Sequence, residues 1–367
     1  MRNWKEIAKL FVIGVKDFKY TKELQSFLTE FPVSGVALFN SPFDSPDNVW
    51  KDRQASLEAV FEFSQKILDR VHFISADQEG GRVRRLRGPF LNLPPAQAIA
   101  DRCSRPDDQM RIFQLYKLAA RQLATAGVGL NFAPVCDLHT THSNNVVGDR
   151  SFGSKTSTVI EWCTRFCEAF REEKVATTLK HFPGHGPSRL DSHEQAALIE
   201  KSLKEYLAED VEIFLKLSAH ADLLMTGHLS FPNDPERILS IDNQLLGQFL
   251  SRLPRQLPLI TDDLLSMKAV SEKKPWLRAF EGPYSFILLC GDLDKIFGAI
   301  EETIRHAEKT VPSFTEQQNL EERIKCSQEM FHTKWRKQTF DSWKTKIEEC
   351  ENEGKQLLKS LQLIDYA

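Results

Sequence analysis

Two scarcities limit what this 367-residue chain can be. No apolar run approaches the roughly 18 residues that a membrane-spanning helix requires, which argues against an integral membrane protein. Positive charge is not in excess, because 48 Lys and Arg residues stand against 51 Asp and Glu residues and leave a net charge of −3. Without an overall basic field, neither a nucleic acid nor a membrane surface is an expected partner.

The cysteines are poorly arranged for cross-linking. The chain has seven cysteines, an odd number, and the closest pair, Cys163 and Cys167, lacks the companions that a metal site needs. Reduced thiols therefore fit better than a disulfide framework. The first residues lack the pattern of a secretory signal, because Leu10–Val15 is an apolar run of strand length only. The sequence predicts a cytoplasmic protein.

What the chain has instead is a repeated alternation of short apolar runs and stretches with helical spacing. The runs are Leu10–Val15, Gly35–Phe39, His72–Ala76, Gly129–Ala133, Val175–Leu179, Asp222–Thr226, Leu257–Thr261 and Ser285–Cys290. They are too apolar for half-exposed strands and indicate a parallel sheet that is buried on both faces. Eight such repeats predict an α/β protein with a (β/α)8 barrel. An open doubly wound sheet is the alternative, although no Gly-x-Gly-x-x-Gly follows the first run.

The last part of the chain has a different composition. Residues 315–360 are rich in Lys, Glu and Gln with scattered aromatic residues, and the β-rich runs have stopped. We therefore expect a catalytic barrel over residues 1–310 and a helical extension over 311–367, packed on the barrel exterior without a part in catalysis.

Ionisable residues gather where the predicted strands end, which is where barrel enzymes place their chemistry. The densest segment begins at Lys180 and ends at His193. Within it, Asp191 and His193 are separated by one residue, so in an extended loop their side chains can form a hydrogen bond. A carboxylate on one imidazole nitrogen leaves the other nitrogen to exchange a proton with a substrate. Taken alone, an Asp-x-His is more often a turn cap beside a surface histidine.

Six ordered blocks give this segment its context. The longest is Lys180-His181-Phe182-Pro183-Gly184-His185-Gly186 followed by Asp191-Ser192-His193. It resembles the signature loop of the β-N-acetylglucosaminidases of glycoside hydrolase family 3. The resemblance extends to Asp77-Gln78-Glu79-Gly80-Gly81-Arg82-Val83, Leu130-Asn131-Phe132-Ala133-Pro134-Val135, Asp149-Arg150-Ser151-Phe152-Gly153, Met225-Thr226-Gly227-His228 and Thr261-Asp262-Asp263-Leu264. It covers about residues 30 to 270.

The resemblance implies a retaining double displacement. By position, Asp262 matches the family's nucleophile, and His193, oriented by Asp191, matches its acid/base. An imidazole, whose ordinary pKa is about 6.5, can supply the proton near neutral pH without the raised pKa that a glutamate would need. Asp263 is the rival nucleophile, but adjacent residues at a strand end point to opposite faces, and the register favours Asp262.

The resemblance also implies a sugar pocket. The matching positions are Asp77, Arg85, Arg150, Lys180 and His181. We expect Glu79, in a tight turn, to bond backbone amides, and His185 and His228 to be structural.

The sequence departs from the family at two places. An extra leucine in Leu264-Leu265 affects the shape of the loop after Asp262. The proline that is common soon after His193 is missing, which affects loop closure and the preference for a leaving group.

The implied activity is release of terminal N-acetylglucosamine from a muropeptide of the GlcNAc-anhydroMurNAc type, by a monomer without cofactor or metal, in peptidoglycan recycling. Phosphate in place of water as the acceptor stays open. A metal-dependent barrel hydrolase is one alternative, with its ligands drawn from the Lys180–His193 segment, but such sites gather ligands from several strand ends. A non-catalytic sugar-binding barrel is the other, and the intact Asp191, His193 and Asp262 argue against it.

Overall fold

The computed structural model describes residues 4–16, 18–39, 52–139, 147–185, 196–267, 270, 274–310, 314–331 and 338–366.

Eight parallel strands form the central sheet, in the order β11-β9-β7-β6-β3-β2-β1-β12. Their bounds are β1 (Phe11–Val15), β2 (Gly35–Leu38), β3 (Phe73–Ala76), β6 (Val128–Asn131), β7 (Ala176–Phe182), β9 (Leu223–Thr226), β11 (Leu259–Thr261) and β12 (Ile287–Leu289). A parallel bridge between Ile260 and Phe286 joins the two edge strands, so the sheet closes. The predicted barrel is confirmed, and each predicted run overlaps one strand.

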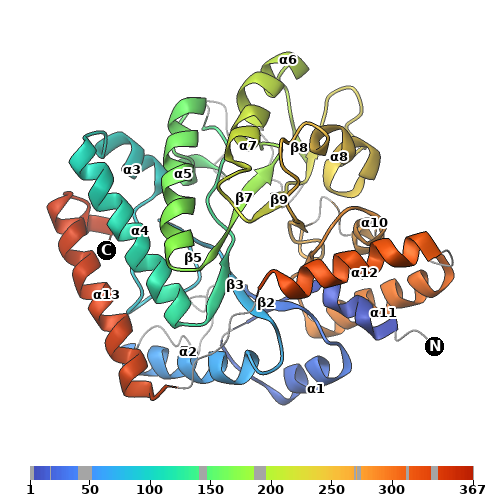
Figure 1. Ribbon diagram of the computed structural model, residues 1–367, viewed down its shortest axis with the longest axis horizontal. Helices are drawn as coiled ribbons and strands as arrows, with labels where there is room; N and C mark the ends of the chain where they lie inside the picture. Colours follow the sequence, from blue (N-terminus) through green and yellow to red (C-terminus); the bar gives the residue numbers. More distant parts are fainter. Residues whose placement is uncertain are drawn as a thin grey trace.

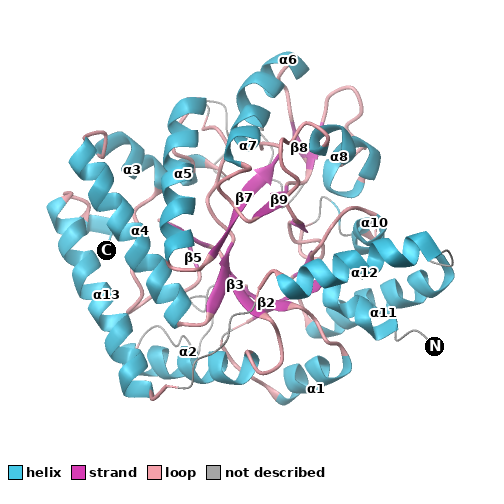
Figure 2. Ribbon diagram, in the orientation of Figure 1, coloured by secondary structure: helices cyan, strands magenta, loops and turns pink. Residues whose placement is uncertain are grey.

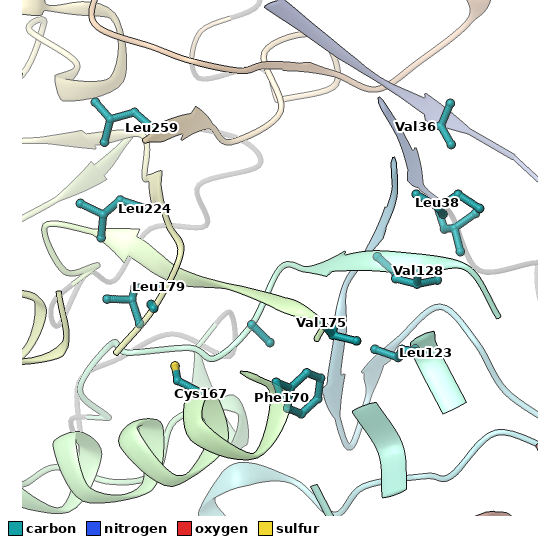
Figure 3. Packing of buried hydrophobic residues seen from close by; sticks show 14 of the residues in the cluster. Val36, Leu38, Leu123, Val128, Cys167, Phe170, Val175, Leu179, Leu224 and Leu259 are labelled. Atoms are coloured by element: carbon teal, nitrogen blue, oxygen red, sulfur yellow. The ribbon is translucent and has the colours of Figure 1, made fainter. Parts of the chain in front are cut away.

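The barrel strands bury both of their faces, because successive side chains point to opposite sides. In β9, Leu223 and Met225 belong to the cluster inside the barrel, whereas Leu224 belongs to the cluster between the strands and the helices. Figure 3 shows this outer layer, where Leu224 and Leu259 lie on the same side as Cys167 and Phe170 of a covering helix. Two apolar layers explain why the strands read as continuous apolar runs.

Helices surround the barrel (Figure 2). They are α1 (Lys22–Glu30), α2 (Arg53–Ile67), α3 (Ala96–Arg102), α4 (Pro106–Thr125), α5 (Thr156–Glu172), α6 (Leu203–Tyr206), α7 (Glu212–Leu217), α8 (Asn243–Leu250), α10 (Pro275–Glu281) and α11 (Leu293–Thr310). Short strands lie outside the barrel, namely β4 (Gln78–Gly80) paired with β5 (Val83–Arg84), and β8 (Ala197–Leu198) paired with β10 (Leu229–Ser230). Short helical turns are η1 (Trp4–Leu10), η4 (Gly148–Arg150), η5 (Leu207–Val211), η6 (Leu239–Ile241) and η7 (Ile364–Tyr366).

Two further helices, α12 (Phe314–Glu329) and α13 (Phe340–Ser360), follow the barrel. Figure 1 shows α13 lying beside α4. Trp343 of α13 is buried there, and its indole nitrogen donates a hydrogen bond to the carbonyl of Thr125 at 2.6 Å. Helical structure after residue 310 agrees with the expectation; the division into two units at that residue stays a prediction.

The extension also reaches the interior of the barrel through Phe331. This side chain is 5% exposed and belongs to the inner cluster. Its ring centroid lies 4.7 Å from that of Phe73 and 5.9 Å from that of Phe286. Both partners stand where their strands begin, so Phe331 closes the end of the barrel opposite to the strand termini that carry ionisable residues.

We expect Phe331→Ala to lower the free energy of unfolding by about 3–4 kcal/mol, because it leaves a cavity among aromatic rings. The catalytic constants should stay within about twofold, since the change lies at the far end of the barrel. Urea unfolding of the purified variants measures the loss. Phe297→Ala is the control, because that ring is 38% exposed on α11. Equal losses in the two variants would contradict the role given to Phe331.

The described cysteines are free and buried, in agreement with the predicted reduced thiols. Among the described residues, no helix combines the length and apolarity needed to cross a membrane.

Candidate active site

The sequence-predicted site residues within the described part of the chain lie at one rim of the barrel. Asp77 directly follows β3, Lys180 and His181 stand near the end of β7, and Asp262 directly follows β11. Because the strands are parallel and the sheet is closed, their carboxyl ends form a single mouth. Residues far apart in the sequence are therefore brought together there.

Cations and carboxylates alternate on one side of this mouth. Nζ of Lys180 lies 2.8 Å from Oδ1 of Asp77 and 2.5 Å from Oε1 of Glu79. Nη2 of Arg85 lies 2.8 Å from Oδ2 of Asp77, and Nη2 of Arg150 lies 2.8 Å from Oε1 of Glu79. The structure thus joins Asp77, Arg85, Arg150 and Lys180, as expected of one pocket, and it adds Glu79.

These groups are charged at neutral pH despite their burial. Burial alone would raise the pKa of Glu79, but the charges of Arg150 and Lys180 outweigh it and lower the pKa to about 2. Burial would likewise raise the pKa of Asp77, but the charges of Lys180 and Arg85 outweigh it and hold the pKa well below its usual range. Lys180 is 2% exposed, and burial would lower its pKa, yet its two carboxylate partners raise it. The result is a rigid array of fixed charges.

The expectation for Glu79 was wrong, because its carboxylate pairs with side chains and not with the amides of its turn. The amides are held by its neighbour instead: Oε1 of Gln78 accepts hydrogen bonds from the backbone of Arg85 at 3.0 Å and of Leu86 at 3.1 Å. Since side chains alternate along a strand, Glu79 is directed away from this turn and toward Lys180.

Asp137 organises the histidines of the β7 end. Its Oδ2 lies 2.7 Å from Nδ1 of His181, and its Oδ1 accepts a hydrogen bond from the backbone of His185 at 2.7 Å. Burial would raise the pKa of Asp137, but the two histidines lower it to about 2. With Nδ1 of His181 bound, Nε2 is the ring nitrogen left for a substrate. Asp137 lies a few residues after the fourth predicted run, Gly129–Ala133, and the sequence patterns did not predict this role.

Asp262 and Asp263 have different surroundings. The carboxylate of Asp263 is buried and accepts hydrogen bonds from the backbone of Leu265 at 3.1 Å, Ser266 at 3.0 Å and Cys290 at 2.7 Å, and from the Ser266 hydroxyl. The carboxylate of Asp262 is partly exposed and accepts the backbone hydrogen bond of Asp263 at 2.8 Å. Asp263 is thus engaged in shaping the loop that contains the extra leucine, which leaves Asp262 as the carboxylate available to a ligand.

Asp191 and His193 lie outside the described residues, so the dyad stays a prediction.

The two histidines that were expected to be structural have different surroundings. Nδ1 of His228 lies 2.6 Å from Oγ of Ser240, and its Nε2 lies 3.0 Å from the carbonyl of Asp263. His185 differs, because it is buried and neither of its ring nitrogens has a hydrogen-bond partner among the residues that the structure describes. Burial lowers its pKa to about 4, so the ring is neutral.

No cluster of three or more His, Cys, Asp or Glu side chains is placed to hold a metal ion within the described ranges. The metal-site alternative included Asp191 and His193, which are not among them.

The sequence and the fold were compared with those of known proteins. Residues 4–279 match the model of the glycosyl hydrolase family 3 N-terminal domain. A β-hexosaminidase of Stenotrophomonas maltophilia is 32% identical over 226 residues, which are 61% of this chain and 64% of that protein. A β-hexosaminidase of Glaesserella parasuis is 27% identical over 299 residues, 80% of this chain and 84% of that one. The structure of a β-N-acetylhexosaminidase from Beutenbergia cavernae is similar with a TM-score of 0.75 at 20% identity, over 89% of this chain and 98% of the other.

Proposed function

This chain belongs to glycosyl hydrolase family 3, and from that premise we propose that it is a retaining exo-β-N-acetylglucosaminidase. The observation that carries the proposal is the position of Asp262 at the barrel mouth, with its carboxylate not engaged by the surrounding loop as that of Asp263 is. Asp262 directly follows β11 and Asp77 directly follows β3, so both residues stand at the carboxyl ends of barrel strands, which supports a common site. The β-hexosaminidase relatives support the reaction class.

The fixed charges suit a sugar ring. We assign substrate binding to Asp77, Arg85, Arg150, Lys180 and His181. A carboxylate accepts from vicinal hydroxyls, and the cations donate to sugar oxygens. Nε2 of His181, whose Nδ1–H donates to Asp137, accepts from a sugar hydroxyl. Because these side chains are already paired and at least partly buried before substrate arrives, little ordering is needed when it binds.

The reaction has two steps. In the first, Asp262 attacks the anomeric carbon while the bond to the leaving oxygen breaks, and that oxygen takes a proton from His193, which Asp191 orients. In the second, His193 removes a proton from water, and the water oxygen displaces Asp262 from the anomeric carbon. The products are N-acetylglucosamine, with its configuration retained, and the released alcohol.

The finer assignment follows from the sequence resemblance. We propose that the leaving group belongs to a muropeptide of the GlcNAc-anhydroMurNAc type, and that the enzyme works as a cytoplasmic monomer in peptidoglycan recycling. Neither a metal nor an organic cofactor enters the two steps. The relatives' names support the hexosaminidase class alone.

The first test compares a 4-nitrophenyl N-acetyl-β-glucosaminide with the plain β-glucoside. We expect the acetamido sugar to be preferred by about 100-fold or more in kcat/KM, because a site built for a polar group discriminates against the analogue that lacks it. Product analysis with and without phosphate identifies the acceptor. Turnover of neither glycoside by a folded protein would favour the sugar-binding alternative, and loss of activity with a chelator would favour the metal-dependent one.

A further inference from the structure

The backbone of Asp263 lies between the proposed nucleophile and a buried histidine. Its N–H donates a hydrogen bond to Oδ1 of Asp262 at 2.8 Å. Its carbonyl oxygen lies 3.0 Å from Nε2 of His228, which is 1% exposed. Because a carbonyl oxygen can only accept, Nε2 carries a proton and donates to it. A single residue thus joins His228 to one oxygen of the Asp262 carboxylate.

The opposite side of the His228 imidazole is also held. Nδ1 lies 2.6 Å from Oγ of Ser240, which is buried. In the neutral imidazole one nitrogen carries the proton, so with that proton on Nε2, Nδ1 accepts a hydrogen bond from the Ser240 hydroxyl. The two partners together fix both the orientation and the tautomer that lets His228 donate to Asp263.

Further hydrogen bonds lead from Ser240 back to Asp262. The Tyr284 hydroxyl donates to the Ser240 carbonyl at 2.8 Å, and since its proton is used there, it accepts from Oγ1 of Thr226 at 3.0 Å. The Thr226 carbonyl accepts from the backbone N–H of Asp262 at 3.2 Å. The contacts form one closed network, whose members are Thr226, His228, Ser240, Asp262, Asp263 and Tyr284.

This network is suited to hold one arrangement. Except for Asp262, its members are buried, with exposed fractions of 4% or less. Every nitrogen and oxygen of its neutral side chains has a hydrogen-bond partner within it. A buried polar network that is fully satisfied rigidifies its surroundings. It adjoins the reacting carboxylate, where a misplacement of about 1 Å can cost about 10²-fold in rate.

We propose that His228 is a positioning residue for the nucleophile. It holds the backbone of Asp263, whose N–H keeps Oδ1 of Asp262 in place and leaves Oδ2 to attack the anomeric carbon. Ser240 and Tyr284 keep the imidazole in the orientation and tautomer that this requires. The role rests on the proposed function. His228 does not touch the sugar and acts through Asp263.

Two amide substitutions separate the two hydrogen bonds of His228. The amide of Asn falls near Nδ1 of the imidazole and can reach Ser240 alone, whereas the amide of Gln, one methylene farther out, falls near Nε2 and can donate to Asp263. We expect His228→Asn to lower kcat for 4-nitrophenyl N-acetyl-β-glucosaminide by about 10- to 100-fold. His228→Gln should stay within about threefold of wild type. The inhibition constant of N-acetylglucosamine should change less than about twofold in both, because the charged sugar pocket is left intact.

Ser240→Ala tests the network without changing the imidazole. It removes the hydroxyl that holds Nδ1, so the proton can move from Nε2 to Nδ1 and the bond to Asp263 is then lost. We expect kcat to fall by about 3- to 10-fold with the inhibition constant unchanged. The matched control is Ser64→Ala. Ser64 is buried on α2, and its Oγ donates to the carbonyl of Ala126 at 2.7 Å. It should lower the urea midpoint to a similar extent and leave kcat unchanged.

The outcomes distinguish this role from the function on which it rests. Equal losses of kcat in His228→Asn and His228→Gln, in an enzyme whose wild type is active, would overturn the positioning role alone. If neither His228 variant folds, a Ser240→Ala enzyme as active as Ser64→Ala would overturn it. A wild type that hydrolyses no N-acetyl-β-glucosaminide would overturn the proposed function and the positioning role with it.

Discussion

Replacing Asp262 by Asn is expected to lower kcat by about 10⁴-fold or more on any N-acetyl-β-glucosaminide. An amide cannot attack the anomeric carbon, so the covalent intermediate does not form. The fold should be unaffected, since the amide oxygen can still accept the backbone hydrogen bond of Asp263 that the carboxylate accepts at 2.8 Å. Steady-state kinetics measures the fall. A 5-fluoro-N-acetylglucosaminyl fluoride, which slows the second step, should label Asp262 in the wild type.

Asp263→Asn is the matched control because it makes the same change one residue later. The Asp263 carboxylate binds the backbone amides of Leu265, Ser266 and Cys290, and the amide that replaces it cannot accept all of these bonds. We expect a loss of about 2 kcal/mol in unfolding free energy with kcat reduced by less than about 10-fold. The reverse pattern, with an active Asp262 variant and an inactive Asp263 variant, would reassign the nucleophile.

The barrel was predictable because its strands bury two faces. A run such as Leu257–Thr261 carries apolar residues without alternation, and the structure shows why: Ile260 lies in the inner cluster and Leu259 in the outer one. Strand ends were less certain. The fifth run was expected to stop at Leu179, yet β7 continues to Phe182, since pairing with the neighbouring strand, and not apolar character, decides where a strand ends.

Contacts between distant residues were harder to anticipate. The partners of Glu79 are Lys180, about 100 positions away in the sequence, and Arg150, 71 positions away, and a turn motif gives no indication of them. Phe331 follows the polar helix α12. The composition of this part of the chain predicted a position on the barrel exterior, and not a contact inside the barrel. In both cases the packing of the whole fold decides the environment, and local propensity does not.

Lys180→Met should have the second largest effect, because Lys180 is a buried cation between two carboxylates that are themselves largely shielded from solvent. Its removal leaves Asp77 and Glu79 each without one partner, at 2.8 and 2.5 Å respectively. Breaking a buried pair in this way costs about 3–5 kcal/mol of unfolding free energy. We also expect kcat/KM to fall by about 10²- to 10³-fold, because a charged donor to the sugar is lost. Lys216→Met, at an exposed pair, serves as the control for both measurements.

The pH dependence separates the electrostatic loss from a loss of packing. In the wild type the pKa of Glu79 is lowered from its ordinary 4.5 to about 2, so the stability that this carboxylate contributes is present above pH 4.5 and is lost as the pH falls toward 2. Without Lys180 the pKa of Glu79 and of Asp77 should rise. The difference in unfolding free energy between wild type and variant should then be largest at neutral pH and shrink below about pH 4.5. A difference that stays constant over this range would show that Lys180 acts through its apolar stem and not through its charge, which would remove the electrostatic basis proposed for the sugar pocket.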